Sequence, residues 1–190
     1  MIQGFLLYTM EYFDIVDEKG IPTGETVERT VAHAQGIRHR TAHLWILRKG
    51  ISGTEVLLQK RTMTKDSFPG CYDISSAGHM PAGSDYIESA IRELKEELGL
   101  EANPKDFIFC GDKTASRDTE FYGKEFHDRE YCRVFALWRD VKDNEFTFQA
   151  EEVSGVIWMN LDECIEAVRE NRIPHCIFLE ELLMLKAAIE

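Results

Sequence analysis

Residues 78–100 read GHMPAGSDYIESAIRELKEELGL, and their apolar residues recur at the spacing of an α-helix. One apolar stripe is formed by Ile87, Ala90, Ile91, Leu94 and Leu98. Asp85 and Glu88 match the capping box that starts a helix, and Gly99 is the residue type that often follows a helix end. We therefore predict a helix that begins after Asp85 and ends before Gly99.

Three glutamates, Glu93, Glu96 and Glu97, lie in the last turns of this predicted helix. Residues three or four positions apart are neighbours on a helix, and like charges there cost about 0.2–0.5 kcal/mol per pair. The helix dipole also disfavours anions near the C-terminal end. The arrangement is therefore unfavourable unless a cation lies against it.

A divalent cation would relieve this repulsion, because Mg²⁺ prefers oxygen ligands and commonly bridges carboxylates to substrate phosphates. The preceding loop, SAGHMPAG at residues 76–83, would bring backbone groups and flexible glycines close to the same site. For an isolated ELKEEL the simpler interpretation is a solvated acidic face. The longer pattern around it favours a metal site.

Strand patterns dominate the sequence on both sides of this helix. Residues 12–30 and 41–61 read as hairpins, and residues 62–83 read as a long loop with a short strand near YDISSAG. Further strands are predicted at 106–115, 129–140 and 153–161, and further helices at 161–171 and 175–190. The sum predicts an α+β fold, an α/β/α sandwich with a mixed β-sheet flanked by helices, in one domain of residues 1–190.

Composition excludes several classes of protein. The 190 residues carry a net charge of −12 without a basic stripe, so we expect no nucleic-acid partner. The apolar runs are too short or too interrupted to span a membrane. Five scattered cysteines without CxxC spacing indicate reduced thiols and a cytoplasmic location. Residues 1–9 are expected to be a disordered or non-native extension, because the regular pattern begins at residue 11, next to Met10.

The stretch from Gly78 resembles the signature of the Nudix hydrolase family, which is glycine, five residues, glutamate, seven residues and then Arg-Glu-apolar-x-Glu-Glu-x-Gly-apolar. The positions in register are Gly78, Arg92, Glu93, Leu94, Glu96, Glu97, Gly99 and Leu100. Ser84 departs from the family, which usually has a glutamate there. A long gapped match of this kind is more specific than a short motif.

The resemblance implies a Nudix fold and an enzyme that cleaves a diphosphate linked to another moiety. It implies a Mg²⁺ or Mn²⁺ site with Glu93, Glu96 and Glu97 as ligands, together with the backbone of Gly78. Arg92 would orient the catalytic glutamate. Ser84 cannot hold this arginine as the usual glutamate does, so either Asp85 or Glu88 substitutes for it or the arginine is held less firmly and turnover is lower. The resemblance also implies a small-molecule diphosphate as the substrate and suggests a homodimer.

The general base is left open between two positions. Glu96, like Glu93, is a catalytic candidate within the helix. Many Nudix enzymes instead take the base from a later loop, where the sequence offers Glu151 and Glu152, and we select Glu152. A solvated loop explains this pair equally well.

Most of the chain is similar to the Nudix branch of type I isopentenyl-diphosphate isomerase. His39 and His79 fall where the isomerase has metal-binding histidines, and Trp158 falls on an aromatic of its isoprenoid pocket. Asp128 and Glu130 fall on two glutamates near the metal, so Glu130 joins the candidate ligands.

Two further positions follow from this similarity, and one is rejected. Arg61 and Lys65 fall where the isomerase grips the diphosphate, through a guanidinium fork and a point charge. His33 misses the position of a third metal histidine by one residue, so we assign it no role. Ordinary structural roles are the alternative for each histidine.

Ala77 argues against isomerase activity. The isomerase has its essential cysteine at this position, and alanine has no proton to give. Water attack on phosphorus needs no such group, so hydrolysis is favoured over isomerisation. The alternatives are an isomerase with rewired acid–base groups and a non-catalytic nucleotide- or diphosphate-binding module.

Residues 112–128 are predicted to form an insertion that shapes the substrate pocket. Phe121, Tyr122 and Phe126 within it either pack the insertion down or stack on a base, and packing is slightly favoured. The moiety attached to the diphosphate is not legible in the sequence.

Overall fold

A computed structural model describes residues 10–65 and 67–190 of the chain. The predicted N-terminal extension, residues 1–9, lies outside the described residues. None of the helices in the described ranges is long and apolar enough to cross a membrane. The five cysteines are free thiols, as predicted.

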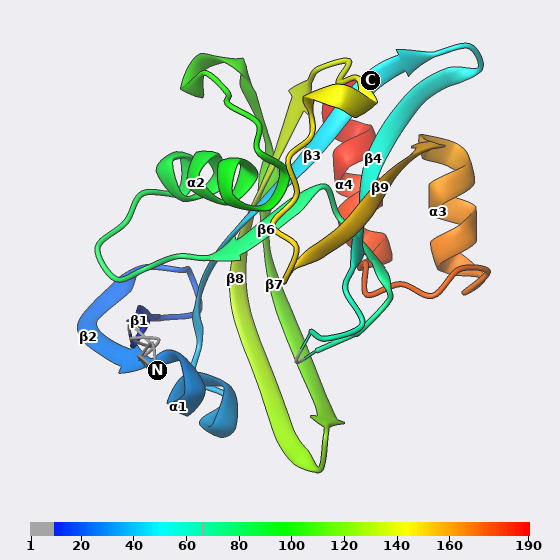
Figure 1. Ribbon diagram of the computed structural model, residues 1–190. Helices are drawn as coiled ribbons and strands as arrows, with labels where there is room; N and C mark the ends of the chain where they lie inside the picture. The colour runs from blue at the N-terminus through cyan, green and yellow to red at the C-terminus, as the bar shows by residue number, and fades with distance from the viewer. Residues whose placement is uncertain (1–9, 66) are drawn as a thin grey trace, which may run out of the picture.

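A mixed sheet of seven strands forms the centre of the fold (Figure 1). Its strands are β3 (His39–Gly50), β4 (Gly53–Arg61), β5 (Tyr72–Asp73), β6 (Ser76–His79), β7 (Phe107–Phe121), β8 (Lys124–Trp138) and β9 (Val153–Asn160). The path β5-β4-β3-β8-β7 makes the body of the sheet, with β6 paired to β3 and β9 paired to β4. Among these described strands, β3 and β8 run parallel, and the other pairings are antiparallel.

Helices cover both faces of this sheet, so the predicted α/β/α sandwich is confirmed. On one face lies α2 (Tyr86–Leu98), and on the other lie α3 (Leu161–Arg169) and α4 (Leu179–Ile189). Figure 1 shows α2 in front of the strands and α4 behind them. Two short 3₁₀ turns, Pro104–Asp106 and Asp143–Glu145, lie in the connections.

A small unit closes one end of the sheet. It consists of β1 (Tyr12–Val16), β2 (Pro22–Glu28) and α1 (Arg29–Gln35), which pack around the buried ring of Phe13. In Figure 1 this unit lies beside the lower half of β8. The β1–β2 hairpin was predicted, whereas α1 was not.

The helix α2 has the limits that its sequence predicts. The Asp85 side chain accepts a hydrogen bond from the Ile87 N–H at 2.9 Å, and Gly99 ends the helix with a left-handed φ of 71°. Leu94 and Leu98 are buried against the sheet. Capping and periodicity therefore suffice to define this helix.

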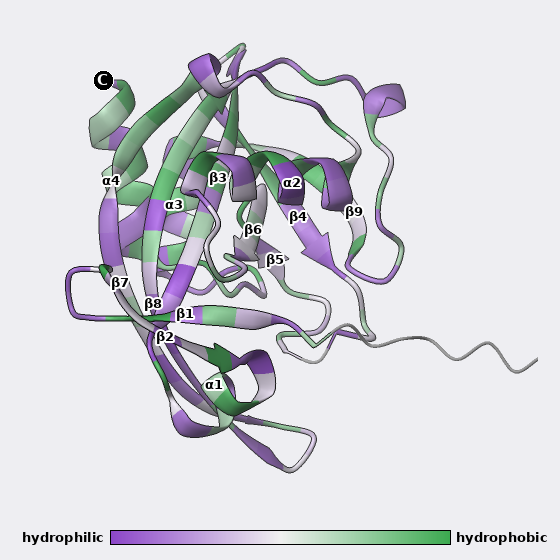
Figure 2. Cartoon of the chain, turned by 90° about the vertical axis from the view of Figure 1, so that its left-hand side faces the viewer, coloured by the Kyte–Doolittle hydropathy of each residue, from purple (hydrophilic) through white to green (hydrophobic). Residues whose placement is uncertain are grey.

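Two predicted elements have other limits in the structure. Residues 112–128 form the outer part of a continuous β7–β8 hairpin, so both strands extend beyond their predicted ends. Its tip, Tyr122 and Gly123, takes positive φ values of 52° and 76°, as a tight two-residue turn requires. In Figure 2 polar and apolar bands alternate along both strands.

The last helix begins at Leu179 rather than at residue 175. The Cys176 N–H donates to the Tyr72 carbonyl at 3.0 Å, and the Tyr72 N–H donates to the Pro174 carbonyl at 2.8 Å. These bonds hold residues 174–176 extended beside β5, so the helix starts only after them.

Alternation along the strands decides which side chains meet. On β3, Ala42 and Leu44 face α2, whereas Trp45 and Leu47 face α3 and α4. On β6, Ala77 faces α4, and a Cβ built on Gly78 would overlap the Glu93 carboxyl of α2. The close approach of α2 to β6 thus requires a glycine at position 78.

The substitution Gly78→Ala should lower the free energy of unfolding by about 1–3 kcal/mol, the usual cost of overpacking. The added methyl group would collide with the Glu93 carboxyl and push α2 outward. Chemical denaturation measures the change. Gly155→Ala is the matched control, because a Cβ there meets nothing within 4 Å, and an equal loss in both variants would contradict this packing.

Candidate functional site

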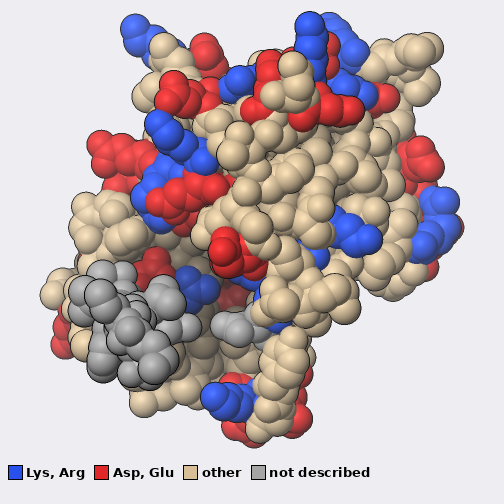
Figure 3. All heavy atoms as spheres, in the orientation of Figure 1, with Lys and Arg blue, Asp and Glu red and all other residues tan. Residues whose placement is uncertain are grey.

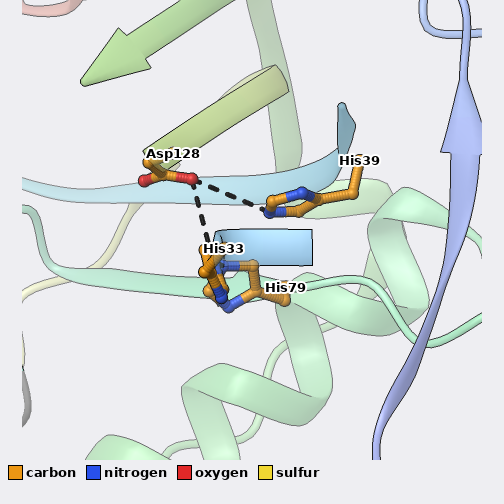
Figure 4. Close-up of side chains that lie close together, drawn as sticks. All are labelled: His33, His39, His79 and Asp128. Atoms are coloured by element: carbon orange, nitrogen blue, oxygen red, sulfur yellow. Dashed lines mark hydrogen bonds and ion pairs between the residues drawn. The ribbon is translucent and has the colours of Figure 1, made fainter. Parts of the chain in front are cut away.

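Three histidines and an aspartate from four different elements meet at one end of the sheet. They are His33 of α1, His39 at the start of β3, His79 at the end of β6 and Asp128 of β8. Each offers one ligand atom, and these atoms lie within 4.8 Å of one another. Figure 4 shows the imidazole rings and the carboxylate pointing toward one another.

The pairing of the strands explains the meeting of three of these residues. His79 lies opposite Thr41 on β3, and His39 lies opposite Glu130 on β8. Residues two positions apart on a strand share a face, so His39, His79 and Asp128 all face the α4 side. The left-handed Gly36 ends α1, which supplies His33 from the side.

The hydrogen bonds leave ligand atoms free at the centre of this cluster. Nδ1 of His39 is 2.9 Å from the Ile37 carbonyl, which fixes the tautomer with a bare Nε2. Within the part of the chain that the structure describes, His39 Nε2 and Asp128 Oδ1 are buried without a hydrogen-bond partner. They lie 3.8 Å apart, and Nε2 of His33 and His79 lie 3.2 Å apart.

Aromatic packing and burial keep these histidines neutral. Phe13 stacks on His39 and His79, and Phe126 stacks on His33. Burial lowers the pKa of all three histidines, that of His33 to about 4. Burial also raises the pKa of Asp128 to about 6. Neutral imidazoles and a carboxylate whose Oδ1 accepts no hydrogen bond from the described residues are the donor set that a divalent transition metal binds, so the residues fit a metal ion.

Glu130 connects this cluster to a second buried group. Its two carboxylate oxygens lie 3.9 Å from His79 Nε2 and 4.0 Å from His43 Nε2. Cys132 Sγ is 3.4 Å from the carboxylate. His43, Glu130 and Cys132 form the other group of potential metal ligands among the described residues.

A carboxylate on α4 holds His43 from behind. Glu181 is only 1% exposed and lies 2.9 Å from His43 Nδ1, while Trp45 Nε1 and Lys113 Nζ also donate to it. Burial alone would lower the pKa of His43, but the Glu181 carboxylate raises it well above its ordinary value. His43 therefore lies in a buried ion-pair network with Glu181 and Lys113.

The predicted glutamates of α2 lie on the opposite face of the sheet. Arg92 donates to Glu93 Oε1 at 2.7 Å, to Glu96 Oε2 at 2.8 Å and to the carbonyl of His79 at 3.2 Å. Glu96 is half-exposed, whereas Glu93 packs against Gly78 and Glu97 is buried. In Figure 3 the surface below α2 is hollowed, and acidic and basic side chains lie together there.

Burial dominates the electrostatics of two of these glutamates. It raises the pKa of Glu93 to about 7 and that of Glu97 to about 8. Oε2 of Glu97 has no hydrogen-bond partner in the described ranges. A cation at these oxygens would restore the charge that burial removes, so the carboxylates fit a divalent ion. The three glutamates do not converge as tightly as the histidine cluster.

The predicted phosphate-gripping residues are engaged with the protein itself. Arg61 forms an ion pair with Asp73 at 3.0 Å, and its other N–H groups donate to Ser67. Lys65 pairs with Glu152, the candidate base. Trp158 lies under the guanidinium of Arg48 on the α2 side, away from the histidine cluster.

His33 is the site residue that sequence reasoning set aside. Its spacing differs by one residue from the pattern it was compared with, and α1 absorbs this difference by presenting the ring from a helix. The signal was present in HAQGIRH, where two histidines flank a glycine that ends a helix. Recognising it required the prediction of α1.

Comparisons with known proteins agree with this architecture. A family model described as NUDIX domain matches residues 37–178. A Nudix hydrolase of Clostridium acetobutylicum is 35% identical over 158 residues, covering 80% of this chain and 71% of that protein. The Nudix hydrolase YfcD of Escherichia coli is also 35% identical, covering 83% of this chain and 78% of that protein.

A solved structure has the same fold. The crystal structure of a Deinococcus radiodurans protein covers 95% of this chain and all of that chain, with a TM-score of 0.65. Its sequence is only 19% identical, so the likeness concerns the fold alone. The two proteins therefore share the mixed sheet between helices although few of their residues are identical.

In metal-free protein, stability should fall as the pH rises from 6.5 to 8.5. The folded pKa values of Glu93 and Glu97, about 7 and 8, exceed their ordinary value of 4.5, so the folded state holds protons that the unfolded state releases. The two glutamates contribute most to the free energy of unfolding at low pH, and this contribution is lost as the pH rises through their folded pKa values. The lowered histidine pKa values act only below 6.5, where unfolded histidine titrates.

Thermal unfolding of EDTA-treated protein measures this trend. Glu97→Gln removes one titrating carboxyl and should lose less stability than the native chain over the same interval. The comparison cancels the contribution of His43, whose raised pKa acts in the same direction in both proteins. Equal pH profiles for the two proteins would contradict the assignment.

Proposed function

The chain belongs to the Nudix hydrolase family, and on this premise we propose that it is a metal-dependent pyrophosphohydrolase. Its substrate would be a nucleoside di- or triphosphate or another organic diphosphate. We further propose a single-domain cytoplasmic homodimer that acts on small molecules, without a nucleic-acid or membrane partner. The family supports hydrolysis of a diphosphate, and the remaining features rest on the residues.

The observation that carries this proposal is the buried Glu97. It is 7% exposed, its pKa is raised to about 8, and one carboxylate oxygen lacks a partner. Ionising this group in the folded chain is costly, because a buried charge without a counterion is unfavourable. A divalent cation is the counterion that the arrangement lacks.

Glu93, Glu96 and Glu97, with the backbone of Gly78, would hold Mg²⁺ or Mn²⁺ on the α2 face. When bound, such an ion neutralises phosphoryl oxygens and lowers the pKa of water. Arg92 fixes the orientation of Glu93 and Glu96 through its two hydrogen bonds. It does so without the usual glutamate at position 84, because the carbonyl of His79 accepts a third hydrogen bond.

A second ion would suit the histidine cluster. Imidazole ligands favour transition metals over Mg²⁺, so Mn²⁺ is the ion that both sets of ligands accept. Glu152 can accept the proton of the attacking water once it leaves Lys65, and Glu96 is the other candidate. Lys65, released at the same time, could then bind a phosphate.

Glu97→Gln should reduce diphosphate hydrolysis by at least about a hundredfold, since even supporting residues of metal sites are worth 10–100-fold. The measurement is phosphate release from nucleoside triphosphates, nucleotide sugars, dinucleotides and isoprenoid diphosphates, with Mg²⁺, Mn²⁺ or EDTA. Glu88→Gln, an exposed position on the same helix, is the control and should keep full activity. Native turnover by the Glu97 variant would refute the site.

One observation favours a second candidate, an isopentenyl-diphosphate isomerase-like activity. His39, His79, Asp128 and Glu130, which this similarity assigns to the isomerase metal site, lie together in the structure. His43 lies directly opposite Ala77 on the neighbouring strand, on the face where the isomerase has its cysteine. The His43–Glu181 pair could supply the proton that Ala77 lacks.

Incubation with isopentenyl diphosphate and Mn²⁺ separates the two candidates. We expect no dimethylallyl isomer, because His43 is held by Glu181 and Ala77 offers no acid. Product analysis by NMR checks this expectation. Formation of the isomer, and its loss in His43→Gln, would establish the second candidate instead.

A further inference from the structure

The guanidinium of Arg117 on β7 is clamped between two phenyl rings. Its central carbon lies 4.4 Å from the ring centroid of Phe68 and 4.4 Å from that of Phe178. Nη2 donates one hydrogen bond, to the Cys176 carbonyl at 3.0 Å. The loop with Phe68 and the segment with Cys176 and Phe178 thus hold this cation in one orientation, and its other N–H groups make no hydrogen bond with the described residues.

The neighbouring cations form ion pairs within 4 Å, whereas Arg117 forms none in the described part of the chain. Arg61 pairs with Asp73, Lys113 with Glu181, and Arg129 with Asp118. Arg117 forms no ion pair with any carboxylate among residues 10–65 and 67–190. The Arg117 guanidinium is half-buried and has N–H groups without a partner among the described residues, in a chain with a net charge of −12. Such a group can bind an anionic ligand through charge-assisted hydrogen bonds.

Arg117 also lies beside the histidine cluster. It is paired across the hairpin with Asp128, one of the four cluster residues, so both side chains share a face of the sheet. No ion pair within 4 Å joins the two side chains in the described residues, although the Arg117 charge opposes the effect of burial, which raises the pKa of Asp128. A phosphate bound near the cluster would therefore find both a metal site and a positioned fork of N–H groups.

The clamp depends on an unusual backbone conformation. Phe68 has a φ of 48°, in the left-handed region that residues with large side chains seldom adopt. Its ring also packs edge-on against Phe121, which in turn packs against Phe126. Such a conformation persists where the surroundings hold it, and it clusters at ligand-binding sites.

We propose that Arg117, oriented by Phe68 and Phe178, is the residue that binds a phosphoryl group of the substrate's diphosphate and so selects for diphosphate compounds. This inference rests on the proposed hydrolase function and adds a residue that the family signature does not contain. It also assigns the main phosphate contact to Arg117 instead of Arg61, because the N–H groups of Arg61 already bind Asp73 and Ser67. Planar bidentate binding is the property that distinguishes Arg117 from a lysine.

A purely structural role makes a different prediction. A clamp that only fastens the hairpin to the C-terminal segment would affect stability and leave anion binding unchanged. Arg133 provides the matched control, because it lies over the rings of Tyr86 and Phe109 but is paired with Asp112. It therefore has the stacking of Arg117 without the free charge.

The test is titration calorimetry of the full chain with inorganic pyrophosphate in the presence of Mn²⁺. Arg117→Gln should weaken binding by about tenfold to a hundredfold, the effect of losing hydrogen bonds to a charged group. Arg117→Lys should lie between this variant and the native chain. Arg133→Lys should bind like the native chain, and thermal unfolding without ligand reports any loss of structure separately.

Binding by Arg117→Gln within twofold of the native affinity would overturn the inference, whether or not stability falls. So would a native chain that binds no pyrophosphate at millimolar concentration. Hydrolysis assays on the same proteins keep this outcome apart from the proposed function. If Arg117→Gln binds pyrophosphate more weakly but the native chain hydrolyses no substrate, only the proposed hydrolase function is contradicted. If Arg117→Gln hydrolyses a substrate with native KM and kcat, only the proposed role of Arg117 is contradicted.

Discussion

The alternation of side chains at Gly78 and His79 governs the organisation of the site. Neighbouring residues of a strand point to opposite faces of the sheet, so β6 meets α2 with Gly78 and the histidine cluster with His79. The absence of a side chain at Gly78 lets Glu93 press against the strand. Arg92 then bonds to the carbonyl of His79, which links the two faces through a single peptide.

Buried carboxylates in this protein differ in whether the chain itself supplies their counterions. Around Glu181, the chain provides its own cations, and the carboxylate keeps a pKa lowered to about 2 although burial alone would raise it. Around Glu97 and Asp128, burial raises the pKa to about 8 and about 6, and buried oxygens lack partners. Cations from solution would supply the missing counterions of Glu97 and Asp128, whereas Arg117 is proposed to bind an anion. Carboxylates without counterions close to an arginine without an ion pair are typical of sites that bind metal-bound phosphates.

Local signals predicted the parts of the fold that depend on near neighbours. The limits of α2 follow from its apolar period, the Asp85 cap and Gly99, and the hairpin turns follow from glycine. The predicted end of one strand at residue 115 and start of the next at residue 129 were wrong, because pairing over fourteen positions along β8 continues both strands to the turn. The last helix starts late for the same reason, since residues 174–176 bond to Tyr72.

The α+β class, the acidic helix and the membership of the family could be predicted from the sequence, because these features depend on spacing along the chain. Tertiary structure alone decided that His33 joins His39 and His79, that Arg61 is occupied by Asp73 and that Arg117 is not occupied. These facts depend on which strands pair and in which register. Contacts between residues distant along the chain are set by the packing of the whole sheet, and no local pattern encodes them.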